Sequence, residues 1–341
     1  MAVFIPLVLS ALGLANSATA VPTTSSRSAV AGWQGFDKIS YIFSFGDSYT
    51  TTGFNVTMEQ PCPSNPFGNP PYPGYTSSNG PNWIDFLTTT YNQSFIETIN
   101  LAYGGATVDS DLVAQYLPTV LDLRQQVNEE FLPYYAAKDK TVDIPWKSDN
   151  SLFSFFFGIN DVGNSYSTGI NKTLNDAIFA EYAKQVDVTY QAGARNFLFL
   201  NVPPVNRAPL TTGTNDTSIE ELEEQDIEAF NNGLTALAKN LTTTYADAVV
   251  FEFNTNLAFT LVLGNPDLYP QTENLRNTTG YCVAYENGTD EPDSFDPSCG
   301  VAVNEFFWLN TLHPTYPMQN VTAEQVSKLL DGSSTQFTVA L

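Results

Sequence analysis

Five short apolar segments, separated by stretches with helical or polar patterning, are the feature that most constrains the fold of this chain. They cover residues 39–45, 95–102, 151–157, 196–202 and 249–253. Apolar and aromatic runs of this length are typical of strands buried on both faces. Because helical segments alternate with them, the sequence predicts βαβ units and an α/β fold, a three-layer αβα sandwich around a mostly parallel five-stranded sheet.

Helices are expected between these strands. A proline near the first turn marks a helix from Asn82, and Gly193 marks the end of another whose apolar residues are spaced by three and four. Ser218 and Glu221 have the spacing of a capping box that opens a third helix. Further helical stretches are predicted over residues 111–135 and 322–331.

Two long segments have no strand or helix pattern. Residues 53–82 are dense in proline and glycine, and residues 265–304 read as an irregular excursion. Loops of this length inside a compact domain usually have a function, so the first is expected to border a binding site. Its aromatic side chains either stack on a sugar ring or pack the loop onto the body, and both readings stay open for Phe67, Tyr72 and Tyr75.

The first twenty residues read as a secretory signal peptide. Residues 1–20 carry no charge, have an apolar centre and end in Ala18-Thr19-Ala20, which fits a signal peptidase site. A membrane anchor is the weaker alternative because the apolar run is short for a bilayer. Residues 21–32 are then expected to be a flexible tail and residues 33–341 a single domain, because no linker or repeat interrupts them.

Glycosylation sequons support the prediction of a secreted, extracellular protein. Used sites must lie on the surface, and chance sites are common in a sequence rich in asparagine and threonine. The candidates are Asn55, Asn92, Asn171, Asn215, Asn240, Asn277, Asn287 and Asn320.

The charge balance limits the possible partners. The chain has 36 acidic and 13 basic residues, a formal net charge of −23. Such a surface repels phosphate backbones and anionic lipids, so nucleic acid and membrane surfaces are poor candidates. Solubility of a secreted protein at acidic pH explains the charge, and we expect a monomer without a membrane span.

Three cysteines are present. Cys282 and Cys299 enclose a polar loop, and a disulfide between them would tie it down in an oxidising compartment, leaving Cys62 unpaired. Other pairings stay open at this point. No cysteine spacing resembles a zinc site, and neither a metal nor a cofactor is predicted.

Polar and glycine residues follow three of the predicted strands. Ser48 lies directly after the first strand, in Gly46-Asp47-Ser48. Ligands in open α/β sheets bind outside the carboxyl ends of the strands, so Ser48 is a candidate nucleophile. Gly105 follows the second strand and offers a bare N–H, and Asn160 follows the third with an amide donor.

These motifs, together with the only histidine, carry a resemblance to a known superfamily. In order and spacing they resemble the GDSL or SGNH hydrolases, through Gly46-Asp47-Ser48, Gly105, Gly158-Ile159-Asn160-Asp161 and His313-Pro314. Three further stretches resemble secreted fungal acetyl esterases of carbohydrate esterase family sixteen, namely residues 65–72, 80–83 and 308–310. The resemblance implies the flavodoxin-like strand order of that superfamily.

The resemblance also implies roles in acyl transfer. Such chemistry needs a nucleophile, a base, and donors where the carbonyl oxygen becomes negative. Ser48 would be the nucleophile, and His313 the base that later protonates the leaving alcohol. The oxyanion hole would combine the N–H groups of Ser48 and Gly105 with the amide of Asn160, each donor stabilising the transition state by about 3 kcal/mol.

One position departs from the family pattern. The residue three positions before the histidine is usually aspartate, and here it is Asn310. Three alternatives stay open: Asn310 orients His313, a backbone carbonyl does so, or a carboxylate enters from residues 285–305. We hypothesise that losing the carboxylate lowers the pKa of His313, so that the base stays neutral at acidic pH.

The sequence therefore predicts a secreted serine esterase that removes acetyl groups, in the family's manner, from short plant cell-wall oligosaccharides. A lipase or lysophospholipase of the same superfamily is a second reading, weakened because no segment resembles a long amphipathic lid. A third is a carbohydrate-binding protein with a degenerate esterase site, which Asn310 makes conceivable and the presence of Ser48 and His313 opposes.

Overall fold

The computed structural model describes residues 1, 32–136, 138–169, 171–333 and 335–341. Apart from residues 1 and 32, the predicted signal peptide and the predicted tail therefore lie outside the described residues. The body begins at Trp33, whose indole Nε1 donates to the Leu330 carbonyl at 3.0 Å. Among helices of the described residues, none combines the length and apolar character needed to cross a bilayer.

The predicted strands all form, in one parallel sheet of order β2-β1-β3-β4-β5. This order is the flavodoxin-like arrangement, so the predicted fold class is confirmed. The strands are β1 (Tyr41–Gly46), β2 (Glu97–Asn100), β3 (Ser151–Phe156), β4 (Asn196–Leu200) and β5 (Val249–Phe253). Ser44 of β1 pairs with Asn100 and Ser154, so the chain segments that follow β1, β2 and β3 emerge side by side.

Helices and short helical turns connect the strands. The α-helices are α1 (Trp83–Thr89), α2 (Leu123–Gln125), α3 (Ile159–Gly163), α4 (Lys172–Ala192), α5 (Pro209–Thr212), α6 (Thr217–Thr244), α7 (Thr255–Gly264) and α8 (Tyr316–Leu330). A π-helix, η2 (Gln126–Ala136), continues α2 directly. The 3-10 turns are η1 (Phe36–Lys38), η3 (Tyr166–Thr168), η4 (Val205–Arg207), η5 (Pro266–Leu268), η6 (Val283–Tyr285) and η7 (Val303–Glu305).

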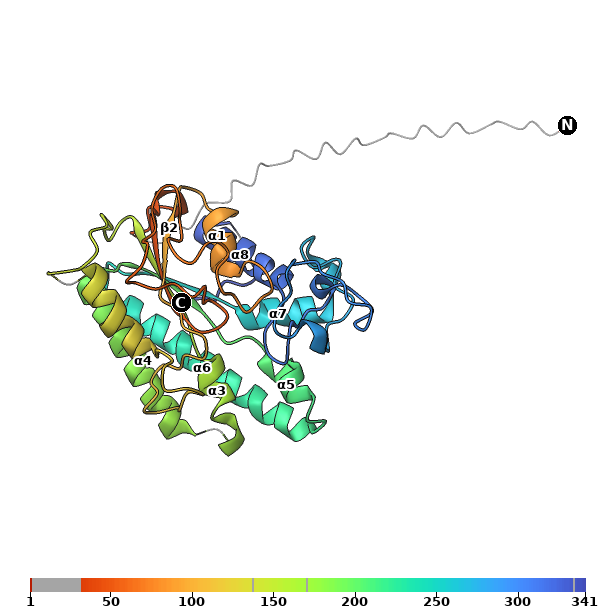
Figure 1. Ribbon diagram of the computed structural model, residues 1–341. Helices are drawn as coiled ribbons and strands as arrows, with labels where there is room; N and C mark the ends of the chain where they lie inside the picture. The colour runs from red at the N-terminus through yellow and green to blue at the C-terminus, as the bar shows by residue number, and fades with distance from the viewer. Residues whose placement is uncertain (2–31, 137, 170, 334) are drawn as a thin grey trace.

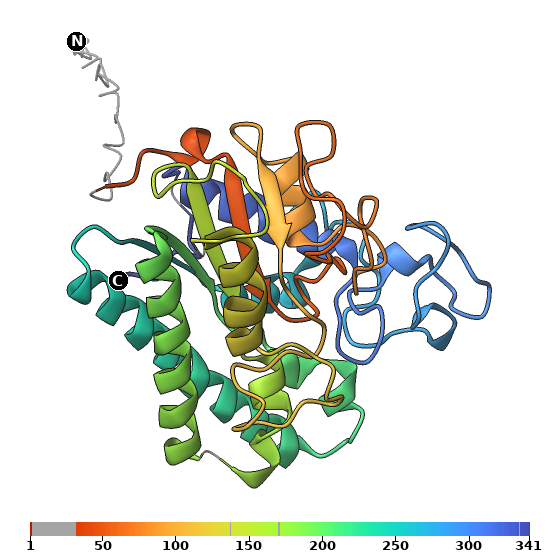
Figure 2. The same ribbon diagram turned by 60° about the vertical axis from the view of Figure 1, so that its left-hand side comes forward.

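The helices form the two outer layers of the sandwich. Helices α1, α7 and α8 pack together on one face of the sheet, and η2, α4 and α6 on the other (Figures 1 and 2). Between them, the strand register stacks aromatic rings: the centroids of Phe43 and Phe153 are 4.9 Å apart and those of Phe45 and Phe155 5.0 Å apart. Stacked rings of this kind add to the area buried in the core.

Three sequence predictions about helices were wrong in detail. Helix α6 is capped by Asp216, not by Ser218, because the Asp216 carboxylate accepts from both the N–H and the hydroxyl of Ser218. Helix α8 begins at Tyr316, well before residue 322, with Pro317 in its first turn. Only the second half of residues 111–135, from Leu123 onward, is helical, because the first half is a loop whose Asp111 and Asp122 form ion pairs with Arg124.

The two predicted loops lie beside each other. Asn79 accepts from the Thr289 N–H at 2.7 Å and donates to its hydroxyl at 2.9 Å. A disulfide joins Cys282 and Cys299, while Cys62 is a free cysteine. A small second core of Tyr285, Val303, Phe306 and Leu309 supports the 265–304 segment, which forms a lobe at the right of Figure 1.

Candidate active site

Ser48 lies in a tight turn at the carboxyl end of β1. The Asp47 carbonyl accepts from the N–H groups of Thr50 and Thr51 at 3.1 and 2.9 Å, and its side chain accepts from the Tyr49 N–H at 3.0 Å. A Cβ at Gly46 would lie 3.0 Å from Thr50 Oγ1 and 3.1 Å from the Phe156 carbonyl, so a side chain there would force its neighbours to shift. The turn thus presents the Ser48 hydroxyl beyond the strand end.

His313 contacts Ser48 although the two are far apart in sequence. The distance from His313 Nε2 to Ser48 Oγ is 2.8 Å. The histidine stands in a short loop before α8, closed by the Leu309 N–H donating to the His313 carbonyl at 2.8 Å. Tyr49 supports this loop, since its buried hydroxyl donates to the Leu312 carbonyl at 2.7 Å.

Asn310 faces the other ring nitrogen of His313. Its Oδ1 accepts from the N–H groups of Leu312 and His313, at 3.0 and 2.9 Å, and lies 3.0 Å from His313 Nδ1. Two backbone donors fix this atom as the amide oxygen, so Nδ1 must carry the proton and Nε2 is left to accept from Ser48. The amide Nδ2 donates to the Glu286 carbonyl at 3.4 Å.

The protein environment keeps His313 uncharged. Burial lowers the pKa of the imidazole from 6.5 to about 4. The direction agrees with our hypothesis that His313 is neutral in acid, but the cause is desolvation. Asn310 is uncharged, so it places no negative charge beside His313 that would offset this desolvation.

The candidate oxyanion donors meet above the ends of β1, β2 and β3. Gly105 has φ +86°, a conformation that favours glycine. Within the described part of the chain, the N–H groups of Ser48 and Gly105 donate to no other group, so both are available to a ligand. Asn160 Nδ2 donates to the Ala106 carbonyl at 3.0 Å, which leaves its second N–H for the same purpose.

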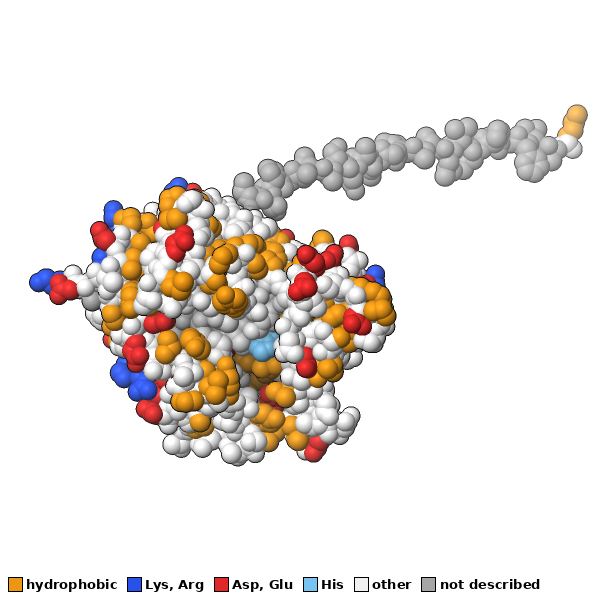
Figure 3. All heavy atoms as spheres, viewed as in Figure 1, with side chains coloured by type: hydrophobic (Ala, Val, Ile, Leu, Met, Phe, Trp, Pro, Cys, Tyr) orange, Lys and Arg blue, Asp and Glu red, His pale blue; other side chains and the backbone are white. Residues whose placement is uncertain are grey.

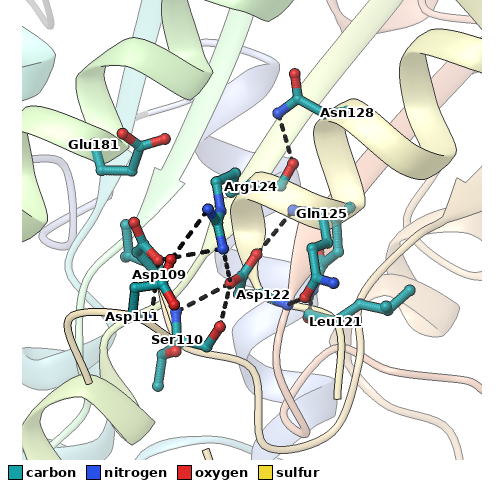
Figure 4. Close-up of polar contacts among 12 residues, drawn as sticks. Asp109, Ser110, Asp111, Leu121, Asp122, Arg124, Gln125, Asn128 and Glu181 are labelled. Atoms are coloured by element: carbon teal, nitrogen blue, oxygen red, sulfur yellow. Dashed lines mark hydrogen bonds and ion pairs between the residues drawn. The ribbon is translucent and has the colours of Figure 1, made fainter. Parts of the chain in front are cut away.

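The loop that carries Gly105 is held from two sides. Asp161, the neighbour of Asn160, is fully buried and accepts from the Val108 N–H at 3.0 Å. Further along, Arg124 forms ion pairs of 3.3 to 3.6 Å with Asp109, Asp111 and Asp122 (Figure 4). These contacts fix where the Gly105 N–H stands.

Tyr116 closes one side of this region. A Cβ at Gly105 would come within 2.1 Å of the Tyr116 ring, so the exposed ring lies directly over the glycine. Sequence reasoning assigned no role to Tyr49, Tyr116 or Asp161. The sequence offered a signal for two of them, because Asp161 is the last residue of the Gly158-Ile159-Asn160-Asp161 motif and Tyr49 directly follows Ser48.

A cleft of about 740 Å³ opens beside His313. It runs between the two long loops, and Figure 3 shows the imidazole in a hollow of the surface. Its lining includes Tyr72 and Tyr75, which are 48% and 77% exposed, whereas Phe67 is buried against Tyr72. Within the loop, Phe67 therefore packs and the two tyrosines face the cleft.

The sequons differ in exposure. Asn55, Asn171, Asn215, Asn240 and Asn287 are exposed, whereas Asn92, Asn277 and Asn320 are half-buried. Asn320 accepts a hydrogen bond from Tyr91, and Asn171 caps α4, which occupies their side chains. Asn287 is the sequon that lines the cleft beside His313.

Comparison with known proteins finds esterases among the relatives of this chain. An acetylesterase of Thermothelomyces thermophilus is 34% identical over 293 residues, covering 86% of this chain and 89% of the relative. A GDSL esterase/lipase of Arabidopsis thaliana is 24% identical, covering 84% and 86%. The structure of an acetyl xylan esterase from Geobacillus stearothermophilus aligns with a TM-score of 0.47 at 14% identity, covering 88% of this chain and 99% of that one.

The family model of GDSL-like lipases and acylhydrolases matches residues 42–326, nearly the whole described body. This span includes each of the candidate site residues and, apart from Tyr41 at the start of β1, each strand. By this match, and by its identity with the acetylesterase over most of both chains, the protein belongs to the GDSL-like lipase/acylhydrolase family and is a carboxylic ester hydrolase.

Proposed function

We propose that this protein is a secreted serine esterase that removes acetyl groups from plant cell-wall oligosaccharides, with Ser48 as nucleophile. The observation that carries the proposal is the chain of contacts from Ser48 Oγ to His313 Nε2, 2.8 Å, and from His313 Nδ1 to Asn310 Oδ1, 3.0 Å. Nucleophilic catalysis by serine requires a hydroxyl next to an unprotonated ring nitrogen, and an acceptor on the other ring nitrogen that orients the base.

In the acylation step, Ser48 Oγ attacks the acetyl carbonyl and His313 Nε2 takes the hydroxyl proton. The carbonyl oxygen becomes negative and accepts from the N–H groups of Ser48 and Gly105 and from the Asn160 amide. The bond to the sugar oxygen then breaks, and that oxygen takes the proton from His313. The products are a free sugar hydroxyl and an acetyl ester of Ser48.

In the deacylation step, water takes the place of the sugar. His313 Nε2 removes a proton from the water as it attacks the acetyl carbonyl, and the same donors stabilise the oxyanion. Ser48 Oγ leaves, regains its proton from His313, and acetate is released. The cycle is a hydrolysis and consumes only ester and water.

The cleft supports a small acyl group on a saccharide. Its lining combines exposed tyrosine rings with hydroxyl and amide side chains, the groups that stack on sugar rings and bond their hydroxyls. The relative from Thermothelomyces thermophilus, which this chain resembles over most of its length, is an acetylesterase. Export is supported by the signal-like residues 1–20 and by exposed sequons.

The substrate class is tested by measuring acetate release from acetylated xylo-oligosaccharides beside hydrolysis of p-nitrophenyl acetate and of a long-chain p-nitrophenyl ester. We expect cleavage of both acetyl substrates, little cleavage of the long-chain ester, and loss of all activity in Ser48→Ala. Preference for the long chain would instead indicate a lipase. Sugar binding without hydrolysis by wild type would indicate a degenerate site.

A further inference from the structure

One wall of the cleft beside His313 is negatively charged. Glu286 and Asp290 belong to its lining, and no lysine or arginine does. Within the described residues, neither carboxylate has an ion-pair partner. Figure 3 shows acidic side chains on the lobe next to the histidine, whereas the basic ones in this view lie toward the margins.

The negative wall has a fixed position. It belongs to residues 286–296, which contain five acidic and no basic residues. The Cys282–Cys299 disulfide encloses this segment, and the Asn79 contacts with Thr289 tie it to the opposite loop. The disulfide and these hydrogen bonds therefore restrain the segment, and its carboxylates stay close to a ligand bound in the cleft.

The remainder of the lining contains no further carboxylate and no lysine or arginine. It consists of tyrosine, threonine, serine, asparagine, glycine and proline side chains, with Leu309 and His313 at the floor. Such groups pair with the hydroxyls of a neutral sugar. A carboxylate ligand would find no cation to pair with, and specific recognition of carboxylates normally uses arginine or lysine.

We propose that this cleft selects acetyl esters of uncharged saccharides and rejects saccharides that carry a uronate. The proposal rests on the proposed function and names its substrate class more narrowly. Like-charge repulsion from Glu286 and Asp290 weakens binding of a saccharide that carries a uronate. This discrimination needs no additional contact with the uncharged saccharide. It weakens with salt, because the Debye length falls from about 30 Å at 0.01 M to about 8 Å at 0.15 M.

The test compares kcat/KM for an acetylated neutral xylo-oligosaccharide and for its counterpart bearing one glucuronate, at about pH 6, where exposed carboxylates are ionised. At about 0.01 M salt we expect the neutral substrate to be favoured roughly threefold to tenfold. The preference should shrink at 0.15 M, about physiological ionic strength. It should also shrink in the double variant Glu286→Gln/Asp290→Asn, because kcat/KM for the charged substrate should rise relative to that for the neutral one.

The control is Glu97→Gln/Asp149→Asn, which removes two negative charges at the amino ends of β2 and β3, the sheet edge opposite the site. This variant should keep the preference. Equal kcat/KM for the two saccharides at low salt would overturn the proposal, as would equal effects of the two double variants. Failure to hydrolyse even the neutral saccharide, with p-nitrophenyl acetate still cleaved, would refute the proposed sugar substrate instead.

Discussion

At the residue scale, we propose that the amide of Asn310 orients His313, in the position where the sequence resemblance leads us to expect a carboxylate. Its oxygen receives three N–H groups, and its Nδ2 faces the Glu286 carbonyl. A carboxylate in the same place would put an oxygen against that carbonyl. An amide therefore fits this site better than a carboxylate does. Unlike a carboxylate, it has no negative charge that would stabilise the protonated imidazole of His313.

The variant Asn310→Asp tests this account. A carboxylate beside Nδ1 favours protonated His313, so its pKa should rise from the lowered value of about 4. We expect the acid limb of the kcat/KM profile to move up by about one to three pH units. Asn310→Ala is the matched control and should lower kcat without moving the limb upward. An unchanged acid limb in Asn310→Asp would contradict the electrostatic argument.

Single residues were predictable where a strand ending or a family motif marked them. Ser48, Gly105, Asn160 and His313 were named from sequence, and the structure brings them together above one sheet edge. The contact between Asn310 and His313 was only one of three open alternatives. Choosing among them requires the loop geometry, which no local pattern encodes.

At the element scale, the site depends on two irregular loops held together by side chains. Asn79 occupies φ 55° and makes its contacts with Thr289 across the entrance of the cleft. The loops were predictable as irregular from their proline and glycine content. Their mutual contact was not, because it joins residues 210 positions apart.

The variant Asn79→Gly removes this tie while keeping the backbone conformation, which glycine tolerates. Because each lost hydrogen bond contributes about 0.5–1.5 kcal/mol, we expect KM for an acetylated oligosaccharide to rise roughly threefold to tenfold. The kcat on p-nitrophenyl acetate should change little. Asn215→Gly, at another φ of 55° on the exposed turn before α6, is the matched control. A lowered kcat on both substrates would place Asn79 in the catalytic machinery instead.

Regular elements were predicted better than their ends. The strands form where apolar runs predicted them, because burial on both faces leaves few alternatives. The start of α6 was misplaced because an earlier polar residue, Asp216, is its N-cap. The loop before α2 was misread as helix because its ion pairs to Arg124 are tertiary contacts.

At the scale of the whole molecule, buried carboxyl groups make stability depend on pH. Desolvation raises the pKa of Asp47 and Asp85 to about 8 and that of Asp161, Glu130 and Glu252 to about 7. At a pH between the ordinary carboxyl pKa near 4 and these raised pKa values, the five carboxyls keep their protons in the folded state but have released them in the unfolded chain. Stability is therefore present at low pH and lost as pH rises.

We expect the free energy of unfolding to fall from about pH 5 to about pH 8, by up to about 1.4 kcal/mol per pH unit for each such carboxyl. The lowered pKa of His313 acts in the opposite direction but is a single group. Urea denaturation at a series of pH values across this range measures how steeply the free energy of unfolding falls with pH. The variant Asp85→Asn keeps an acceptor for the Asn82 N–H and should make this pH dependence less steep. The control Asp149→Asn, at an exposed position, should leave the pH dependence unchanged. Stability that rises toward pH 8 would contradict the assignment.

The central claim is that Ser48 and His313 act as one catalytic unit, and a double-variant cycle tests it most directly. Initial rates of p-nitrophenyl acetate hydrolysis are measured for wild type, Ser48→Ala, His313→Ala and the double variant, with folding checked by circular dichroism. We expect each single variant to lose about 10⁴-fold or more in kcat, and the double variant to lose no more than either. Additive losses, or substantial activity left in Ser48→Ala, would show that the serine and histidine do not form the site.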